Sequence, residues 1–206
     1  MKPMTKRNET NARIVRDYLA YLKEAQRNSE QTIDSVAAAI ARFEDFNKHR
    51  DFRKFHQQQA VAFKRHLANE TSRRGKATLS KSTVRSTLAA LRAFFHWLAG
   101  RPGYRSRFSF SDADYFNPSD RESRIALASR PRPTPTLAQV THTLDCMPHT
   151  TVYERRDRAL MAFLLLTGCR DRTAVSLKLR HVDLKEAVVY QDARDVETKF
   201  GKTLTT

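Results

Sequence analysis

One stretch of the sequence, from Arg158 to Leu184, restricts the possible folds of the chain more than any other. It contains a run that is apolar almost all round, Leu160 to Leu166, and a helix of that kind is expected to be buried on every side. The run ends at Thr167-Gly168, and glycine is the usual residue just past a helix end. Arg170 follows at once, so we expect a charged side chain on a tight turn at the end of a buried helix.

Two interpretations of Arg170 remain open at this point. A cation near a helix C-terminus can bond the last carbonyl groups of that helix, which would give Arg170 a structural role. Alternatively, a buried helix holds its end rigidly, and rigid support is what a side chain that grips a phosphate group needs. A second short helix with Val175, Leu177 and Leu179 is predicted to follow.

The charge of the chain is concentrated in its first half. The formal net charge is +16, and residues 1–107 hold 23 Lys and Arg against 9 Asp and Glu. Residues 108–206 hold 15 against 13, which is close to balance. A basic first half indicates a polyanionic partner, most simply nucleic acid. The alternative is a soluble basic protein without such a partner.

The first 107 residues are predicted to be helical because apolar residues recur at helical spacing. The predicted helices cover residues 10–27, a stretch that begins after the N-cap Ser29, residues 57–69, and a stretch from Ser80 or Ser82 to Gly100. The last of these is the clearest, with apolar residues at steps of three and four. Trp97 is expected to belong to the core.

Basic residues form a second pattern in and before that fourth helix. At about 100° per residue, four of them fall in one stripe beside the apolar face: Lys81, Arg85, Arg92 and His96. The preceding loop adds Arg73, Arg74 and Lys76. Together they are predicted to follow a phosphate backbone, although a solvated helix face is the common alternative.

The middle of the chain is predicted to separate two domains. Residues 101–127 are expected to be irregular, and three alternating prolines within residues 129–136 favour an extended linker. Thr136 and Gln139 form a capping-box pattern, so a second domain is expected to begin near residue 134. Two short strands are predicted at residues 187–190 and 195–199.

Several classes of protein are disfavoured. Two cysteines, Cys146 and Cys169, are too few for a disulfide framework or a zinc site of the usual spacing, so no metal is expected and a cytosolic location is predicted. The chain has no apolar stretch of membrane length, and its first residues do not resemble a signal peptide.

The order of these features resembles the tyrosine recombinase (phage integrase) family of enzymes that cut and join DNA. The features are a basic helical domain, a proline-rich linker, a helix that ends in Thr167-Gly168-Cys169-Arg170, a short second helix, and a hairpin that bears Lys199. The resemblance implies that residues 1–107 are a SAM-like helical bundle that binds DNA, the core-binding domain. It implies that residues 108–133 are a connecting segment. Residues 134–206 would then be the front part of an α+β catalytic domain with a short β-hairpin.

The resemblance also implies a mechanism. Family members attack one DNA strand with a tyrosine, which gives a 3′-phosphotyrosyl link, and they need no metal or cofactor. Arg170 matches the first of the two catalytic arginines, which neutralise the scissile phosphate. Lys199 matches the hairpin lysine that can act as general acid, with Lys202 as the alternative. Family members assemble on double-stranded DNA.

The sequence departs from the family pattern in two respects. Thr173 stands where the family usually has an acidic residue, three places after the first arginine. The His-x-x-Arg box and a late nucleophilic tyrosine are absent from the 206 residues, so a truncated and catalytically incomplete form is predicted. The alternatives are a non-catalytic DNA-binding protein derived from an integrase, which occupies recombination sites, and an RNA-binding or structural protein. The fold class expected is mainly α.

Overall fold

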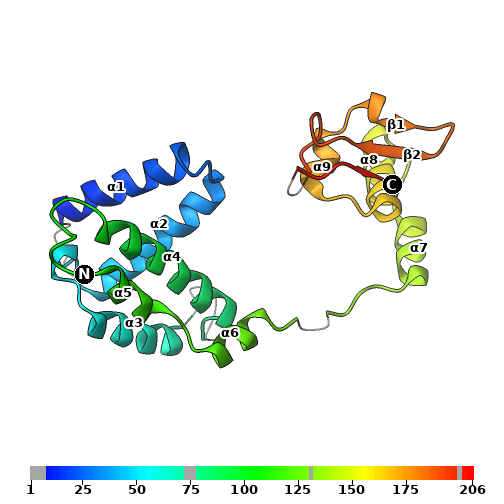
Figure 1. Cartoon of the computed structure of the whole chain (residues 1–206). Coiled ribbons are helices and arrows are strands. Elements are labelled where there is room, and N and C mark those ends of the chain that lie inside the picture. Colours follow the sequence, from blue (N-terminus) through cyan, green and yellow to red (C-terminus); the bar gives the residue numbers. More distant parts are fainter. Residues whose placement is uncertain (1–7, 72–77, 130–131, 199–200) are drawn as a thin grey trace. The chain divides into compact units, whose positions relative to one another are not determined.

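The computed structural model describes residues 8–71, 78–129, 132–198 and 201–206 (Figure 1). The chain forms two compact units, residues 1–130 and residues 131–206, which are called here the N-terminal and C-terminal units. Within the described residues, no helix is both long enough and apolar enough to cross a membrane. The prediction of a mainly α chain is confirmed, since helices dominate both units and the strands are short.

The N-terminal unit is a bundle of four main helices, which run from blue to green in Figure 1. They are α1 (Glu9–Glu24), α2 (Glu30–Phe46), α3 (Gln57–Asn69) and α4 (Lys81–Ala99), and the 3-10 helix η1 (Phe52–Lys54) precedes α3. The predicted helices therefore exist, with small differences at their ends. Ser29 and Ser80 accept hydrogen bonds from the N–H groups of Thr32 and Thr83, which fixes the first turns of α2 and α4.

The core of this unit is rich in phenylalanine. Phe43 is fully buried and its ring lies 5.2 Å from that of Phe63, 5.3 Å from that of Phe95 and 5.6 Å from that of Phe116, each edge to face. Such edge-to-face pairs add stabilisation beyond the burial of apolar area. Trp97 is partly buried and packs against this core, as predicted.

Residues 110–127, which were predicted to be irregular, are largely helical, so that prediction is wrong. They form α5 (Phe110–Ala113), the 3-10 helix η2 (Asp114–Phe116) and α6 (Asp120–Leu127). The irregular segment was predicted from Pro102-Gly103 and Asn117-Pro118, which often interrupt helices. Ser109 with Asp112 and Ser119 with Glu122 nevertheless form capping boxes that begin helices. Ala113 and Phe116 are fully buried, so this segment completes the core of the N-terminal unit.

The C-terminal unit combines three helices with a small sheet. The helices are α7 (Leu137–Cys146), α8 (Val152–Thr167) and α9 (Asp171–Ser176), followed by the 3-10 helix η3 (Leu179–His181). The strands β1 (Val182–Asp183), β2 (Val188–Gln191) and β3 (Leu204–Thr205) form an antiparallel sheet in the order β1-β2-β3. Val182 pairs with Val189, and Tyr190 pairs with Thr205.

Two predictions for this unit are wrong. Helix α8 is not buried on every side: Leu160 is 48% exposed, Leu166 is 88% exposed, and none of its residues is buried. The reason is that α7, the short α9 and the narrow sheet leave much of its surface uncovered. The strand predicted at residues 195–199 is also absent from its described part, residues 195–198, because the chain turns there. On the side of β2 away from β1, the pairing strand is β3.

The capping predictions for this unit are confirmed. Thr136 accepts a hydrogen bond from the N–H of Gln139, whose side chain accepts one from the N–H of Thr136. Gly168 ends α8 in the left-handed conformation, with φ of 59°, which glycine adopts without a steric penalty.

Candidate functional site

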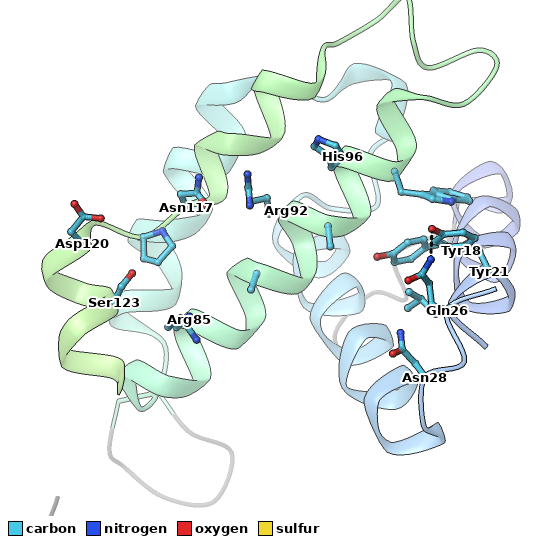
Figure 2. A pocket seen from close by; sticks show the side chains of 15 residues that line it. Tyr18, Tyr21, Gln26, Asn28, Arg85, Arg92, His96, Asn117, Asp120 and Ser123 are labelled. Carbon is cyan, nitrogen blue, oxygen red and sulfur yellow. Dashed lines mark hydrogen bonds between the residues drawn. The ribbon is translucent and has the colours of Figure 1, made fainter. Parts of the chain in front are cut away.

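A broad open hollow of about 790 Å³ lies over the exposed face of α4 in the N-terminal unit. Ala89 and Ala93 of α4 lie in the hollow, and their small, exposed side chains leave the helix backbone accessible. One side of the hollow is formed by the end of α1 and the turn into α2, and the other by residues 117–123 (Figure 2). The hollow is thus a shallow surface that a large partner can reach.

The structure brings the predicted basic residues of α4 together on this face. Arg85, Arg92 and His96 line the hollow and point away from the core (Figure 2). Lys81 and Arg85 also line an adjoining cleft with Lys64. The side chains of Lys81 and Arg85 are exposed and have no hydrogen-bond or ion-pair partner among the residues that the structure describes. Their charged ends are therefore accessible to an anion, although the carboxylate of Glu122 lines the same cleft and lies near Lys81.

Arg92 differs from its neighbours because it has a partner. Its Nη2 lies 2.7 Å from Oδ1 of Asp114, and its Nε donates a hydrogen bond of 2.9 Å to the same oxygen. Asp114 belongs to η2 and is 22 residues from Arg92 in sequence, so no local sequence pattern indicates this pair. Arg92 is thus held at the surface by a carboxylate before any ligand arrives.

The loop residues Arg73, Arg74 and Lys76, predicted to contact DNA, lie outside the described residues. The description of the site therefore does not include these three residues. All of the predicted DNA contacts stay predictions, because geometry alone does not show binding.

Aromatic residues form one side of the hollow. The ring of Tyr18 lies 4.9 Å from that of Trp97, and the guanidinium of Arg101 lies 4.0 Å above the Trp97 ring. Burial, with a smaller contribution from Tyr21, raises the pKa of Tyr18 to about 12, so its hydroxyl stays neutral at physiological pH. The aromatic side of the hollow is uncharged, and Arg101 lies over its Trp97 ring.

Five further polar residues line the hollow and were not predicted from the sequence as site residues, among them Gln26, Asn28 and Asp120. Gln26 and Asn28 lie on the aromatic side, and Asp120 lies on the opposite side (Figure 2). Gln26 and Asn28 occupy the turn between two predicted helices, where polar residues are common. Only their position against α4 distinguishes them from ordinary turn residues.

The C-terminal unit carries the second predicted site. Arg170 is the N-cap residue of α9, and its exposed guanidinium makes no hydrogen bond or ion pair within the described part of the chain. The end of α8 is satisfied by other groups: the Gly168 N–H donates to the Leu164 carbonyl at 2.9 Å, and the Thr167 hydroxyl donates to the Phe163 carbonyl at 2.8 Å. The helix-capping interpretation of Arg170 therefore finds no support in these contacts.

Thr173 links α9 to the segment that precedes Lys199. Its hydroxyl donates a hydrogen bond of 2.9 Å to the carbonyl of Glu197, and the Glu197 N–H donates one of 2.9 Å to the hydroxyl of Ser176. Thr173 is only 2% exposed. Both backbone groups of Glu197 are therefore bound by side chains of α9, one turn from Arg170.

The other predicted residues of this site are less well placed. Lys199 lies outside the described residues, and the alternative Lys202 is exposed. Arg172, and not Arg170, pairs with the carboxylate of Glu197, at 3.6 Å. The catalytic roles of Arg170 and Lys199 stay predictions.

Comparison with known proteins finds a similarity for part of the N-terminal unit. Residues 14–103 match a family model described as "Phage integrase, N-terminal SAM-like domain". The matched segment covers most of α1 and all of α2, α3 and α4, and so includes the basic face of α4. It supports an integrase- or recombinase-related role in DNA binding. No curated protein and no solved structure matches the chain.

Proposed function

We propose, from the premise that residues 14–103 are a phage integrase N-terminal SAM-like domain, that the N-terminal unit binds double-stranded DNA through α4. The observation that carries this proposal is the exposed face of α4, where Lys81 and Arg85 are exposed cations that form no ion pair with the described residues, beside an open hollow. Lysine and arginine side chains that neutralise phosphates release condensed counterions, which provides most of the affinity of such proteins for DNA.

The hollow has the form that a DNA backbone requires. The sugar-phosphate strand is a ridge between the two grooves of a duplex, and a shallow hollow with small residues in its floor admits a ridge. Arg85 and His96 line the hollow at positions three turns apart along α4. At a rise of about 1.5 Å per residue they are spaced by roughly 16 Å, enough to contact two phosphates of one strand that are not adjacent.

The finer proposal concerns the C-terminal unit. We infer that residues 134–206 correspond to the front part of a tyrosine recombinase catalytic domain, in which Arg170 neutralises the scissile phosphate and Lys199 donates a proton to the departing 5′-oxygen. The guanidinium of Arg170 at the N-terminus of α9 supports this role. Among the described residues, no carboxylate forms an ion pair with it that a phosphate would have to displace. No cofactor takes part in this proposal.

We further propose that this chain by itself does not cleave DNA. The resemblance assigns the nucleophile and the second arginine to elements that the 206 residues do not contain. The exposed apolar side chains of α8, among them Leu165 and Leu166, fit a catalytic domain in which further elements cover this helix.

Binding is tested with matched charge variants of the full chain. K81A/R85A removes two cations from α4, whereas R13A/R16A removes two exposed cations of α1 that do not line the hollow. We expect K81A/R85A to weaken the binding of a 30-base-pair duplex and to reduce the slope of log Kd against log salt by about two. Equal losses in the two variants would contradict binding through α4.

A second arm addresses the chemistry. The wild-type chain is incubated with nicked and intact duplexes, and the products are examined for protein linked to a 3′ end. We expect salt-sensitive binding with no covalent product. A covalent product would overturn the proposed catalytic incompleteness, and a preference for single-stranded RNA over duplex DNA in competition would favour the RNA-binding alternative.

A further inference from the structure

The turn between α1 and α2 places two side-chain amides at the edge of the α4 hollow. Gln26 and Asn28 line the hollow on the side opposite residues 117–123 (Figure 2). Neither residue is charged, whereas the cations that face the hollow are on α4. A duplex whose backbone lies on α4 would have the adjacent groove facing this turn.

The two amides are available for hydrogen bonding. Gln26 donates from Nε2 to the hydroxyl of Tyr21 at 2.8 Å, which orients its carboxamide and leaves its carbonyl oxygen and its second N–H free. The side chain of Asn28 has no hydrogen-bond partner among the residues with described placement. A carboxamide offers a donor and an acceptor side by side, and this pair matches N6 and N7 of adenine in the major groove.

The turn itself is firmly held. The N–H groups of Ala25 and Gln26 both donate to the carbonyl of Tyr21, at 3.0 and 3.1 Å, and the N–H of Asn28 donates to the carbonyl of Leu22 at 3.1 Å. The backbone of Arg27 has φ of 53°, in the left-handed region that residues other than glycine adopt rarely. A fixed turn presents its amides in one geometry, and selectivity for a base edge requires such a geometry.

The opposite side of the hollow suits bases better than phosphates too. Asp120 carries a negative charge there and would repel a phosphate, while Ser123 beside it is neutral. The polar but non-cationic groups thus flank the cationic α4 on both sides.

We propose that Asn28, supported by Gln26, is a specificity-determining residue that reads the major-groove edge of an adenine, while the cations of α4 hold the adjacent backbone. This inference rests on the proposed binding of double-stranded DNA by the same face. It assigns affinity to one set of residues and sequence preference to another, which is the usual division between phosphate and base contacts.

The test is selection of bound duplexes from a randomised library by the full chain, followed by sequencing. Wild type is compared with N28A, with N28D, and with the control N69A, which removes an exposed amide of α3 that does not line the hollow. We expect N28A to lower discrimination at one A·T position by about tenfold and to leave the Kd for a non-specific duplex within about twofold. N28D keeps the side-chain shape but only accepts hydrogen bonds, so it should shift that position towards cytosine.

The outcomes separate the two proposals. If wild type binds DNA with strong salt dependence but N28A selects the same sequences as wild type, base reading by Asn28 is wrong and DNA binding stands. If wild type does not bind duplex DNA, both proposals fail. Loss of preference at one position in N28A and its change in N28D, with N69A unchanged, would support the assignment.

Discussion

Arg92 and Asp114 form a two-point ion pair, in which Nη2 and Nε of the guanidinium lie 2.7 and 2.9 Å from one carboxylate oxygen. Both side chains are about half exposed, so the pair adds little to the stability of the fold. We expect a larger effect on the proposed DNA binding, because Asp114 occupies the position from which a phosphate would accept hydrogen bonds. In the proposed binding mode, Arg92 would exchange the carboxylate of Asp114 for a phosphate.

The first prediction follows from this exchange. D114N removes the competing charge while it keeps the size of the side chain, so Arg92 becomes free to contact a phosphate. We expect tighter binding at low salt and a rise of about one in the slope of log Kd against log salt, measured by fluorescence anisotropy. D17N changes the net charge equally from an exposed position on α1. If D17N and D114N behave alike, the effect is one of net charge and the exchange mechanism is wrong.

The second prediction concerns the aromatic core. Phe43 is fully buried among the rings of Phe63, Phe95 and Phe116, so F43A should reduce the free energy of unfolding by about 3–5 kcal/mol. Phe110 is 52% exposed, and F110A should cost less than about 1 kcal/mol. Urea unfolding followed by the fluorescence of Trp97, the single tryptophan, reports on this unit. Similar losses in the two variants would contradict the described core.

Local sequence signals predicted the helices of both units but not the extent of burial. Ser29 and Thr136 were recognised as N-caps, and Ser80 as one of two candidates, because capping depends on residues within one turn. The exposure of Leu166 could not be predicted, because it depends on which elements lie next to α8. The capping boxes of α5 and α6 were present in the sequence, and the nearby Pro102 and Pro118 led to the wrong expectation of an irregular segment.

The residues of the candidate site also fall into those that local sequence signals predict and those that they do not. The stripe of Arg85 and Arg92 was visible because helical periodicity places residues on one face. The positions of Asp114 and Asn28 beside α4 could not be predicted. These residues belong to η2 and to the turn after α1, which only the packed structure brings close to α4. The sequence therefore predicted the site residues that lie on one helix, α4, and not those that other elements bring to it.

The third prediction uses pH. Hydrogen bonds from the N–H and hydroxyl of Ser119, helped by nearby Lys81 and Lys64, hold the pKa of Glu122 below its ordinary value of 4.5. Because the folded pKa is depressed, the stabilisation of α6 is present above pH 4.5 and is lost as the pH falls through the folded pKa. Hydrogen exchange of the α6 amides should therefore accelerate between pH 6 and pH 3, after correction for intrinsic exchange rates.

The matched variant for this test is E122Q. It keeps a capping side chain that does not titrate, so α6 should be less protected at pH 6 and its protection should vary little with pH. E24Q, at an exposed position of α1, should behave as wild type at α6. An unchanged pH profile in E122Q would mean that another group controls the stability of α6.

The last prediction concerns Thr173 and Glu197, which the 2.9 Å hydrogen bond from the Thr173 hydroxyl joins. T173V keeps the shape of the buried side chain and removes the donor, which should cost about 0.5–1.5 kcal/mol. The effect should appear locally, as several-fold faster amide exchange at residues 195–198. T143V is the control, because the Thr143 hydroxyl bonds only a carbonyl of its own helix, at 2.8 Å.

A second substitution at the same position tests what the hydroxyl does. Thr173 stands where the resemblance to tyrosine recombinases would place an acidic residue, and a carboxylate cannot donate to the Glu197 carbonyl. It would also place a charge at a site that is 2% exposed, so T173E should lose more protection at residues 195–198 than T173V. If T173E keeps the protection of wild type, the donor is not what holds this segment to α9. The segment that leads to Lys199 would then depend on Ser176, whose hydroxyl accepts from the Glu197 N–H at 2.9 Å.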